Sequence, residues 1–280
     1  MTALRRLLVV LLATLTVACS HPAPVPSLTV GASADPRITL LANVYAAGLR
    51  YYGTDARVQT VADPVAALDS GVVGVTPGFT GSLLQRFAPG SAARSAEQVY
   101  RAMIGALPEG VASADYAVAA EDKPALAVTG ATANGWGSRD LAALVGHCVG
   151  LIVGVASGVS GPAAVGECKL PKPREFPDFA TLFAALRDGS VTAVWTTTAD
   201  TSIPDGVVVL VDRKPTLVPA ENVVALYRRN ELGKMQLRAL NELAGVLDTA
   251  SLIDMVRQVK AGSDPRTVAE TWLAANPLGK

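Results

Sequence analysis

Cys19 is the residue whose surroundings specify a chemistry most clearly. It directly follows the small residue Ala18, at the end of a segment in which Arg5 and Arg6 precede a short apolar run. A basic head, a short apolar run and small residues before a cut are typical of a secretory signal, and this run is too short to span a bilayer. In bacterial lipoproteins a cysteine in this position is lipidated and becomes the first residue of the mature protein. We therefore expect residues 1–18 to be a signal peptide and Cys19 to carry lipid.

The stretch from Leu15 to Cys19 resembles the lipobox of such proteins, except that Thr16 stands where leucine is more common. The alternative is a plain secretory signal with a chance cysteine. Acyl chains contribute ~0.8 kcal/mol per buried CH2, so two or three of them hold a protein on a membrane without a spanning helix. We expect a protein anchored by lipid to the extracytoplasmic face of the cell membrane, with the proline-containing residues 19–27 as a linker.

Cys148 and Cys168 are the remaining cysteines. Export places them where disulfides persist, and we expect them to be paired. Two free buried thiols, or a metal site, are the alternatives. A metal site is the weaker idea because His147 beside Cys148 lacks the paired-ligand spacing of zinc sites. No metal or other cofactor is expected.

Catalytic signatures do not occur in the chain. It contains no Walker A loop, nucleophile elbow, HExxH motif or credible GxGxxG after a strand. His147 is the one histidine in the folded body, so a Ser/His/Asp arrangement would depend on it, and a structural role is the simpler reading. Ser157 and Ser160, in a glycine-rich stretch, fit a turn or a ligand loop as well as an active-site loop. We therefore do not expect an enzyme.

The charge balance also excludes a class of partner. The chain has 24 acidic and 24 basic residues, which cancel. No net field favours a polyanion, so nucleic acid is not an expected partner. The roughly 260 residues that follow the signal are enough for one two-lobed domain with its own core.

Strand and helix patterns alternate along the body of the chain. Strands are expected at residues 28–31, 58–61, 72–76, 126–129, 149–155, 191–195, 207–211 and 223–226. Helices are expected at residues 38–52, 65–69, 81–87, 95–106, 138–145, 179–188, 233–247, 250–260 and 265–275. Asp63 and Pro64 provide a cap and a first helical residue for one of these helices. This alternation predicts α/β lobes, with a ligand cleft where the carboxyl ends of strands meet.

The segment Pro77-Gly78-Phe79-Thr80-Gly81 carries a family resemblance. It resembles the PEYTG stretch of the osmoprotectant ABC transporter substrate-binding proteins, which bind glycine betaine, choline and related quaternary amines. The preceding ALxxGxxD framework of that family is largely kept in Ala67, Leu68, Gly71 and Gly74. Further matches follow in order: Val30, Gly31, Tyr45, Leu107, Pro108, 125–129, 184–189, 195–200, 208–212, Asn222, Val223 and 264–273. No single motif is specific, but their order and spacing over residues 28–273 are.

The resemblance implies a type II periplasmic-binding-protein fold, an α/β architecture in which two lobes close over a ligand in a central cleft. Each lobe would be a mixed sheet flanked by helices. Residues 28–124 and 216–280 would form lobe 1 and residues 125–215 lobe 2, with hinges near residues 125 and 215. The resemblance also implies a small-molecule solute and an ABC permease in the membrane as partners. We expect the protein itself to be a monomer.

Departures from the family at the expected ligand cage bear on the solute. A quaternary ammonium has no N–H to donate, so proteins hold it by several aromatic faces, each worth ~0.5–2 kcal/mol. The family's cage tyrosine is Phe79 here and another aromatic is kept as Trp195, whereas Pro124 and Glu221 replace two others. Two aromatic faces and a carboxylate favour a primary or secondary amine over a trimethylammonium group. The alternative is that both rings pack in the core and Glu221 lies on the surface.

The residues that would meet a ligand carboxylate are also changed. The family's early lysine is Ser33, and its TRPDG-like arginine has no clean counterpart; Arg174 is a candidate anion clamp, unless it belongs to a solvated basic loop. Thr80 could donate a hydrogen bond at a helix N-terminus, where unpaired N–H groups favour anions.

Two functional classes follow from these features. The first is a lipid-anchored receptor that delivers a small polar or cationic, betaine-like or choline-like, solute to an ABC permease. The second is a divergent envelope lipoprotein that has lost solute binding and acts as an interaction or accessory protein. The altered cage favours the second, whereas the complete likeness along the chain favours the first.

Overall fold

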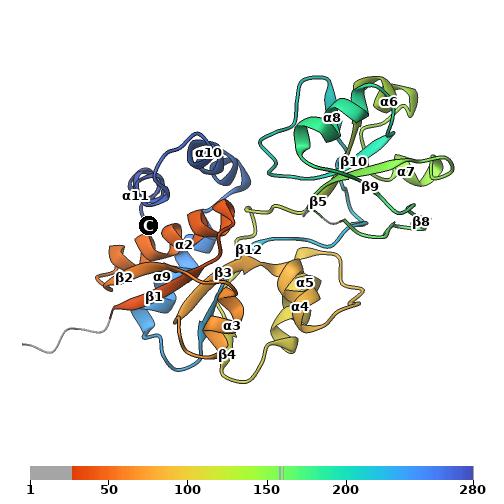
Figure 1. The fold of residues 1–280 in the computed structure, drawn as a ribbon. Helices are drawn as coiled ribbons and strands as arrows, with labels where there is room; N and C mark the ends of the chain where they lie inside the picture. Colours follow the sequence, from red (N-terminus) through yellow and green to blue (C-terminus); the bar gives the residue numbers. More distant parts are fainter. Residues whose placement is uncertain (1–26, 158, 160, 280) are drawn as a thin grey trace, which may run out of the picture.

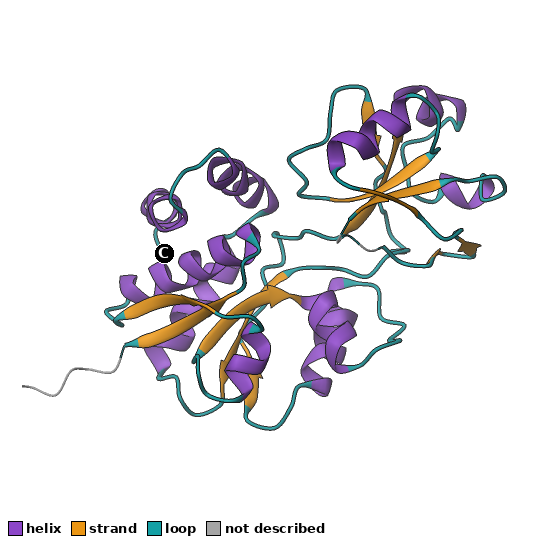
Figure 2. Cartoon of the chain, viewed as in Figure 1, coloured by secondary structure: helices purple, strands orange, loops and turns teal. Residues whose placement is uncertain are grey.

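The structure, a computed structural model, describes residues 27–157, 159 and 161–279. The signal segment and Cys19 lie outside these residues, so the lipid anchor stays a prediction. The described chain forms two α/β lobes joined by two crossing segments (Figure 1). The fold expected from the sequence is confirmed in its class: two mixed sheets, each flanked by helices (Figure 2).

Lobe 1 is built from both ends of the chain. Its elements are β1 (Leu28–Ala32), α2 (Pro36–Tyr51), β2 (Ala56–Thr60), α3 (Pro64–Asp69), β3 (Val75–Phe79), α4 (Thr80–Phe87), α5 (Ala96–Ala106), β4 (Val111–Ser113), β12 (Val223–Arg228), α9 (Lys234–Val246), α10 (Thr249–Lys260) and α11 (Pro265–Ala275). The strand order is β2-β1-β3-β12-β4, with β1 parallel to both β2 and β3 and with β12 antiparallel to β3 and β4. Strand β12 enters the sheet after the chain has returned from lobe 2.

Alternation along β12 divides the interior of lobe 1 into two cores. Val223 and Ala225 face the core formed with α2, α9, α10 and α11, whereas Val224 and Leu226 face the core formed with α3, α4 and α5. Successive side chains of a strand point to opposite faces, so one strand supports both layers. Helix α2, buried over most of its length, begins at Pro36 after the N-cap Asp35 and crosses the first of these cores.

Lobe 2 occupies the middle of the chain. Its elements are β5 (Pro124–Thr129), α6 (Gly130–Gly135), α7 (Ala143–Gly146), β6 (Val153–Ala156), β7 (Ala164–Val165), β8 (Cys168–Lys169), β9 (Arg174–Phe176), α8 (Phe179–Arg187), β10 (Ala193–Thr197) and β11 (Val207–Val209). The main sheet has the order β11-β5-β10-β6-β9, and β7 and β8 form a separate hairpin. Strands β6, β9 and β10 are parallel, while β5 runs against both β10 and β11.

The predicted lengths of two elements of lobe 2 are wrong. The helix expected over residues 138–145 is reduced to turns followed by α7, and the strand expected over 149–155 begins only at Val153. Val149 is 99% exposed, and Gly150 takes a φ of 83°, which interrupts an extended backbone. A prediction from apolar character alone therefore made this strand too long. In lobe 1, the strand expected over 72–76 lies at Val75–Phe79, and Val72, which follows Gly71 with its φ of 78°, is exposed.

The predicted disulfide between Cys148 and Cys168 is confirmed. Cys168 is buried on β8 among the core residues of lobe 2, whereas Cys148 follows α7 at its margin. The bridge therefore attaches the α7 segment and the β7–β8 hairpin, both short, to the same core. Neither element is long enough to be stable by its own hydrogen bonds.

Removing the disulfide should destabilise lobe 2. The bridge joins cysteines 20 residues apart, and in the chain-entropy account such a link contributes roughly 3 kcal/mol. The double variant Cys148→Ser/Cys168→Ser should lose about this free energy of unfolding in urea titrations. A reducing agent should shift the wild-type curve toward that of the variant and leave the variant unchanged. Equal curves for oxidised wild type and variant would contradict a stabilising role.

Candidate ligand site at the junction of the lobes

A buried ion pair joins the two crossing segments. Lys123 Nζ lies 3.1 Å from Asp212 Oδ2, and these side chains are only 9% and 3% exposed. Lys123 precedes β5 on the outward crossing and Asp212 lies on the return crossing. Asp212 also accepts hydrogen bonds from the backbone N–H groups of Leu217 and Val218. The pair therefore fixes the two crossings to one another and shapes the turn that follows Asp212.

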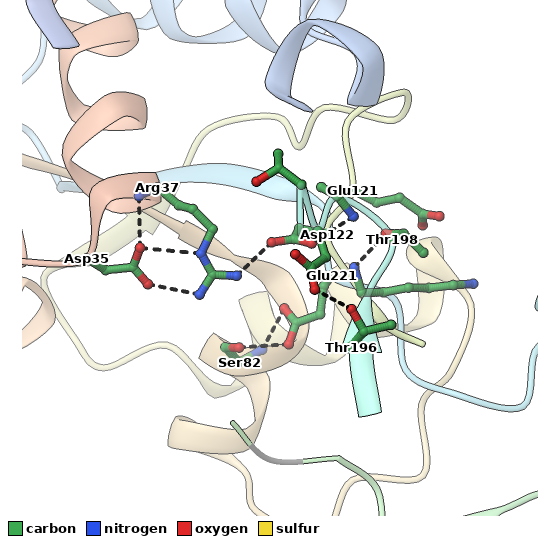
Figure 3. A network of polar contacts seen from close by, with 12 residues as sticks. Asp35, Arg37, Ser82, Glu121, Asp122, Thr196, Thr198 and Glu221 are labelled. Carbon is green, nitrogen blue, oxygen red and sulfur yellow. Dashed lines mark hydrogen bonds and ion pairs between the residues drawn. The ribbon is translucent and has the colours of Figure 1, made fainter. Parts of the chain in front are cut away.

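Asp122 connects α2 of lobe 1 to the segment after β10 of lobe 2 (Figure 3). Its Oδ2 lies 2.7 Å from Arg37 Nη1, and its Oδ1 accepts a hydrogen bond of 3.0 Å from the N–H of Ala199. Arg37 also pairs with Asp35, the N-cap of its own helix. Burial alone would lower the pKa of the Arg37 guanidinium, but the hydrogen bonds and charges of the two carboxylates raise it. The guanidinium therefore remains charged and holds both carboxylates in place.

Glu221 caps the first turn of α4. Its carboxylate accepts hydrogen bonds from the N–H of Ser82 at 2.9 Å and from the Ser82 hydroxyl at 2.7 Å. Burial raises the pKa of Glu221, and the bonds from Ser82 oppose that shift. A Cβ at Gly81 would lie 2.6 Å from the Ala220 carbonyl oxygen and 2.9 Å from Glu221 Cδ, so glycine is needed for this approach. The protein's own carboxylate thus occupies a helix N-terminus at which free anions often bind.

Phe79 and Thr80 lie beside this carboxylate but have different environments. Phe79 is the half-buried last residue of β3 and is paired in register with Val223. Thr80 is fully buried: its N–H donates to the Asn222 carbonyl and its hydroxyl accepts from the Asn222 N–H. The Thr80 hydroxyl therefore connects the β3–α4 turn to the start of β12, while the Phe79 side chain remains partly exposed.

Ser33 lies at the same edge of the lobe 1 sheet. It follows β1, and its hydroxyl accepts a hydrogen bond from the N–H of Asp35 at 3.3 Å. Strands β1 and β3 are parallel, so their carboxyl ends bring Ser33 and Phe79 to one edge, where Glu221 also enters before antiparallel β12. Among the candidate residues, Ser33, Phe79, Thr80 and Glu221 are therefore brought to one edge of lobe 1.

Trp195 and Arg174 lie away from this edge. Trp195 is 1% exposed in the core of lobe 2, and a Cβ at Gly161 would lie 2.2 Å from its ring, so the backbone at Gly161 covers the indole. Arg174 is exposed at the start of β9 and donates to the Ser190 carbonyl at 2.9 Å. That position is the amino end of a parallel strand, opposite the end at which ligands of such sheets gather. Ligand roles for both residues stay proposals.

Four residues of this site were not found by sequence reasoning: Arg37, Ser82, Asp122 and Lys123. The partners of Asp122 and Lys123 lie 85, 77 and 89 residues away along the chain. No local spacing connects such residues, because the connection exists only once both crossings are in place. The one available signal was the Asp35-Pro36 pair, a helix start that places Arg37 in the first turn.

Metal sites and membrane-spanning helices are both absent from the described residues. No group of three or more metal-ligating side chains is placed to hold an ion within them, and His147 stacks on Trp136 with ring centroids 4.9 Å apart. None of the helices in these ranges has the length and hydropathy needed to cross a membrane.

Comparison with known proteins decides the family. Residues 26–275 match the model of the substrate-binding domain of ABC-type glycine betaine transport systems. The chain belongs to this family. It is accordingly the substrate-binding component of an ABC transporter of the glycine betaine type, a non-catalytic family that acts outside the cytoplasm. A search of curated protein sequences finds no match.

Solved structures agree with this fold at low sequence identity. A glycine betaine/carnitine/choline ABC transporter structure superposes with a TM-score of 0.71 at 16% identity, covering 89% of this chain and 98% of the other. A choline-binding protein in complex with choline gives 0.59 at 17% identity, with 90% and 89% covered. The glycine betaine/L-proline-binding protein of Borrelia burgdorferi gives 0.56 at 12% identity, with 90% and 94% covered. The predicted family and type II periplasmic-binding fold are thus confirmed.

Breaking the buried ion pair of the betaine-family protein should be strongly destabilising. Lys123→Met leaves the Asp212 carboxylate without its cation, and removing one partner of a buried pair costs about 3–5 kcal/mol. The double variant Lys123→Met/Asp212→Asn removes both charges, while an amide oxygen can still accept from the backbone. Urea unfolding should show that it recovers at least half of the loss. A double variant less stable than the single one would contradict this account.

The raised pKa of Glu221 gives the stability a defined pH dependence. Between the ordinary glutamate pKa and the raised folded value, the folded protein binds more protons than the unfolded chain, so the free energy of unfolding falls as pH rises through that window. The contribution is fully present below the ordinary value. The difference in stability between wild type and Glu221→Gln should therefore favour wild type most at acidic pH and decline toward neutral pH. Urea titrations at a series of pH values measure it; a difference that increases with pH would contradict it.

Proposed function

We propose that this protein is a lipid-anchored receptor that binds a small organic cation at the lobe junction and delivers it to an ABC permease. The supporting observation is the Glu221 carboxylate. In the described part of the chain its hydrogen-bond donors are both from neutral Ser82, and no cationic side chain pairs with it. Arg37, the nearby guanidinium, is taken up by Asp35 and Asp122. A partly buried carboxylate of this kind gains most from a ligand that brings the missing positive charge.

The type of cation follows from the same geometry. Phe79 offers an aromatic face, which attracts an ammonium group, and Glu221 offers an acceptor for its N–H groups. A ligand carboxylate has no comparable place, because Glu221 already occupies the α4 N-terminus and repels a second negative charge. We infer that amines without a carboxylate, above all those with N–H donors, bind better than glycine betaine.

The anchor proposed at Cys19 adds to this function. A tether confines the lobes near the membrane and raises the effective concentration of the receptor at a permease. The variant Cys19→Ser should move the protein from the membrane fraction to the soluble extracytoplasmic fraction. Incorporation of labelled palmitate into wild type, and its loss in the variant, is the direct measurement. Soluble wild-type protein without label would favour a plain secretory signal.

One observation favours the second candidate function, an accessory envelope lipoprotein without a solute. Trp195, which the family resemblance assigns to the cage, is buried in lobe 2 and offers no face to a ligand as it stands. A receptor that uses this ring would have to expose it.

A ligand panel separates the two functions. Ethanolamine, choline and glycine betaine should be titrated calorimetrically into the purified chain. We expect the affinity to decrease in the order ethanolamine, choline, glycine betaine. Ethanolamine alone has ammonium N–H groups to donate to Glu221, and glycine betaine alone carries a carboxylate. A ligand at 100 times its dissociation constant should raise the free energy of unfolding by ~2.7 kcal/mol.

Variants of Glu221 test the residue that carries the proposal. Glu221→Gln should weaken ethanolamine binding by about tenfold or more, because truncating a desolvated charge partner costs several kcal/mol. Glu97→Gln, on the exposed face of α5, is the matched control and should leave binding unchanged. Tighter binding of glycine betaine than of choline would contradict the cation assignment. No binding across the panel would favour the accessory function.

A further inference from the structure

A cavity lies in lobe 1, apart from the residues assembled at the junction. It has a volume of about 470 Å³ and is lined by Tyr100, Asp115, Tyr116, Val118, Ala119, Asn241, Ala244 and Gly245. Helix α5 supplies Tyr100, α9 supplies Asn241, Ala244 and Gly245, and the segment after β4 supplies the rest. None of these residues belongs to the set that contains Glu221, Phe79 and Ser33.

The location follows from the edge of the lobe 1 sheet. The segment after β4 continues along β12, since the N–H groups of Ala114 and Ala117 donate to the carbonyls of Ala225 and Val223. Helices α5 and α9 pack on opposite faces of β12, as its alternating side chains show. The cavity therefore opens at the sheet edge, where the two helical layers diverge around this segment.

Two aromatic rings form one wall of the cavity. The Tyr100 and Tyr116 ring centroids are 4.6 Å apart with an interplanar angle of 46°. The Tyr100 hydroxyl donates to the Ala114 carbonyl at 2.7 Å, which fixes the ring. Burial raises the pKa of Tyr100, and the nearby charge of Asp115 adds to this. The Tyr100 ring thus stays neutral and keeps the electron-rich face that attracts cations.

Asp115 supplies the negative charge beside these rings. Its backbone N–H donates to Asn241 Oδ1 at 3.0 Å, so the residue is held against α9. Its carboxylate makes no ion pair or hydrogen bond with any residue that the structure describes. Val118, 74% exposed, gives the rim an apolar surface. An unpaired carboxylate, two adjacent aromatic rings and an apolar rim are the groups that hold an alkylammonium ion.

The floor of the cavity consists of small residues of α9. Ala244 and Gly245 line it, and a Cβ built on Gly245 meets no atom within 4 Å. Glycine in a helix interior is destabilising relative to alanine. No backbone strain or close contact in this structure requires glycine at this position, so its effect here is the open volume that it leaves.

We propose that this cavity is a second binding site for small organic cations, formed by Tyr100, Tyr116 and Asp115 on lobe 1 alone. It does not depend on closure of the lobes or on the proposed junction site. A cation bound in this cavity would contact lobe 1 alone. Occupancy of the cavity can therefore be measured separately from binding of a solute between the lobes.

The test uses the full chain labelled with 3-fluorotyrosine and followed by fluorine NMR. The protein has six tyrosines, which give separable resonances that substitution assigns. Tetramethylammonium chloride is the probe, because it has charge and methyl groups but no N–H or carboxylate. We expect saturable shifts of the Tyr100 and Tyr116 resonances. Uncharged tert-butanol, of similar size, should leave both in place.

Variants distinguish a built site from nonspecific binding. Asp115→Asn should raise the dissociation constant of tetramethylammonium about two- to fivefold, the effect of losing one exposed charge partner. Tyr116→Leu should raise it at least about threefold, measured at the Tyr100 resonance. Gly245→Leu should abolish the shifts by filling the cavity, whereas Gly245→Ala should retain them. Asp69→Asn, which removes a carboxylate at the end of α3, is the matched charge control and should bind like wild type.

The outcomes of this test are decisive for the cavity. Absence of a saturable shift, or equal affinity in wild type and Asp115→Asn, would overturn the proposal. Because Asp115 is exposed, its variant remains informative even where Gly245→Leu or Tyr116→Leu is found unfolded by circular dichroism. A negative result for the Tyr100 and Tyr116 resonances says nothing about ethanolamine binding at Glu221. The two proposals can therefore be refuted independently.

Discussion

The arrangement of this protein depends on how the chain crosses twice between its lobes. Each crossing is irregular backbone, which lacks the ladder of hydrogen bonds that orients a strand. Buried side chains take over this role: Lys123 pairs with Asp212 across the two crossings, and Asp122 connects Arg37 to the backbone at Ala199. Such pairs add little net stability, because desolvation offsets their attraction. Their effect is on position, since any other arrangement leaves a charge buried without a partner.

That constraint also sets the chemistry at the edge of lobe 1. Asp122 follows immediately on Glu121, whose neighbour across the sheet is Asn222, and the N–H of Asp122 donates to the carbonyl of Glu221. The crossing and the start of β12 are therefore held together. As a consequence Glu221 is fixed over the first turn of α4, where the Ser82 donors meet it. One set of contacts thus positions both the joint between the lobes and the carboxylate that we propose as a ligand group.

The sequence was sufficient for the fold class, the family and most helices. Helices with a cap and a periodic apolar face were placed within about two residues, for instance Pro265–Ala275 after Asp264. The disulfide followed from the compartment and from the number of cysteines. Short elements such as β4, β7 and β8 were not predicted, because two or three residues carry no period, and Val149 misled because an exposed apolar residue looks like a core one.

For the site, sequence reasoning found the residues that occupy family positions but not what surrounds them. Trp195 was recognised by its place in the family resemblance, yet its burial depends on Gly161, which lies 34 positions earlier in the sequence and contacts it only in the folded protein. Arg174 was selected for its charge, and only the direction of β9 shows that it lies at the amino end of its strand. The type of a residue is local information, whereas its exposure depends on residues from distant segments.

Replacing an aromatic cage residue by glutamate changes more than one contact. An aromatic ring attracts a cation and leaves the neighbouring helix N-terminus free for the anionic half of a zwitterion. A carboxylate attracts the cation more strongly but occupies that N-terminus itself, as Glu221 does through Ser82. On the proposed assignment of the site, the same substitution favours a ligand with positive charge alone and disfavours one that carries both signs. The proposal then needs no compensating base at Ser33, because a ligand without a carboxylate has no negative charge for such a base to meet.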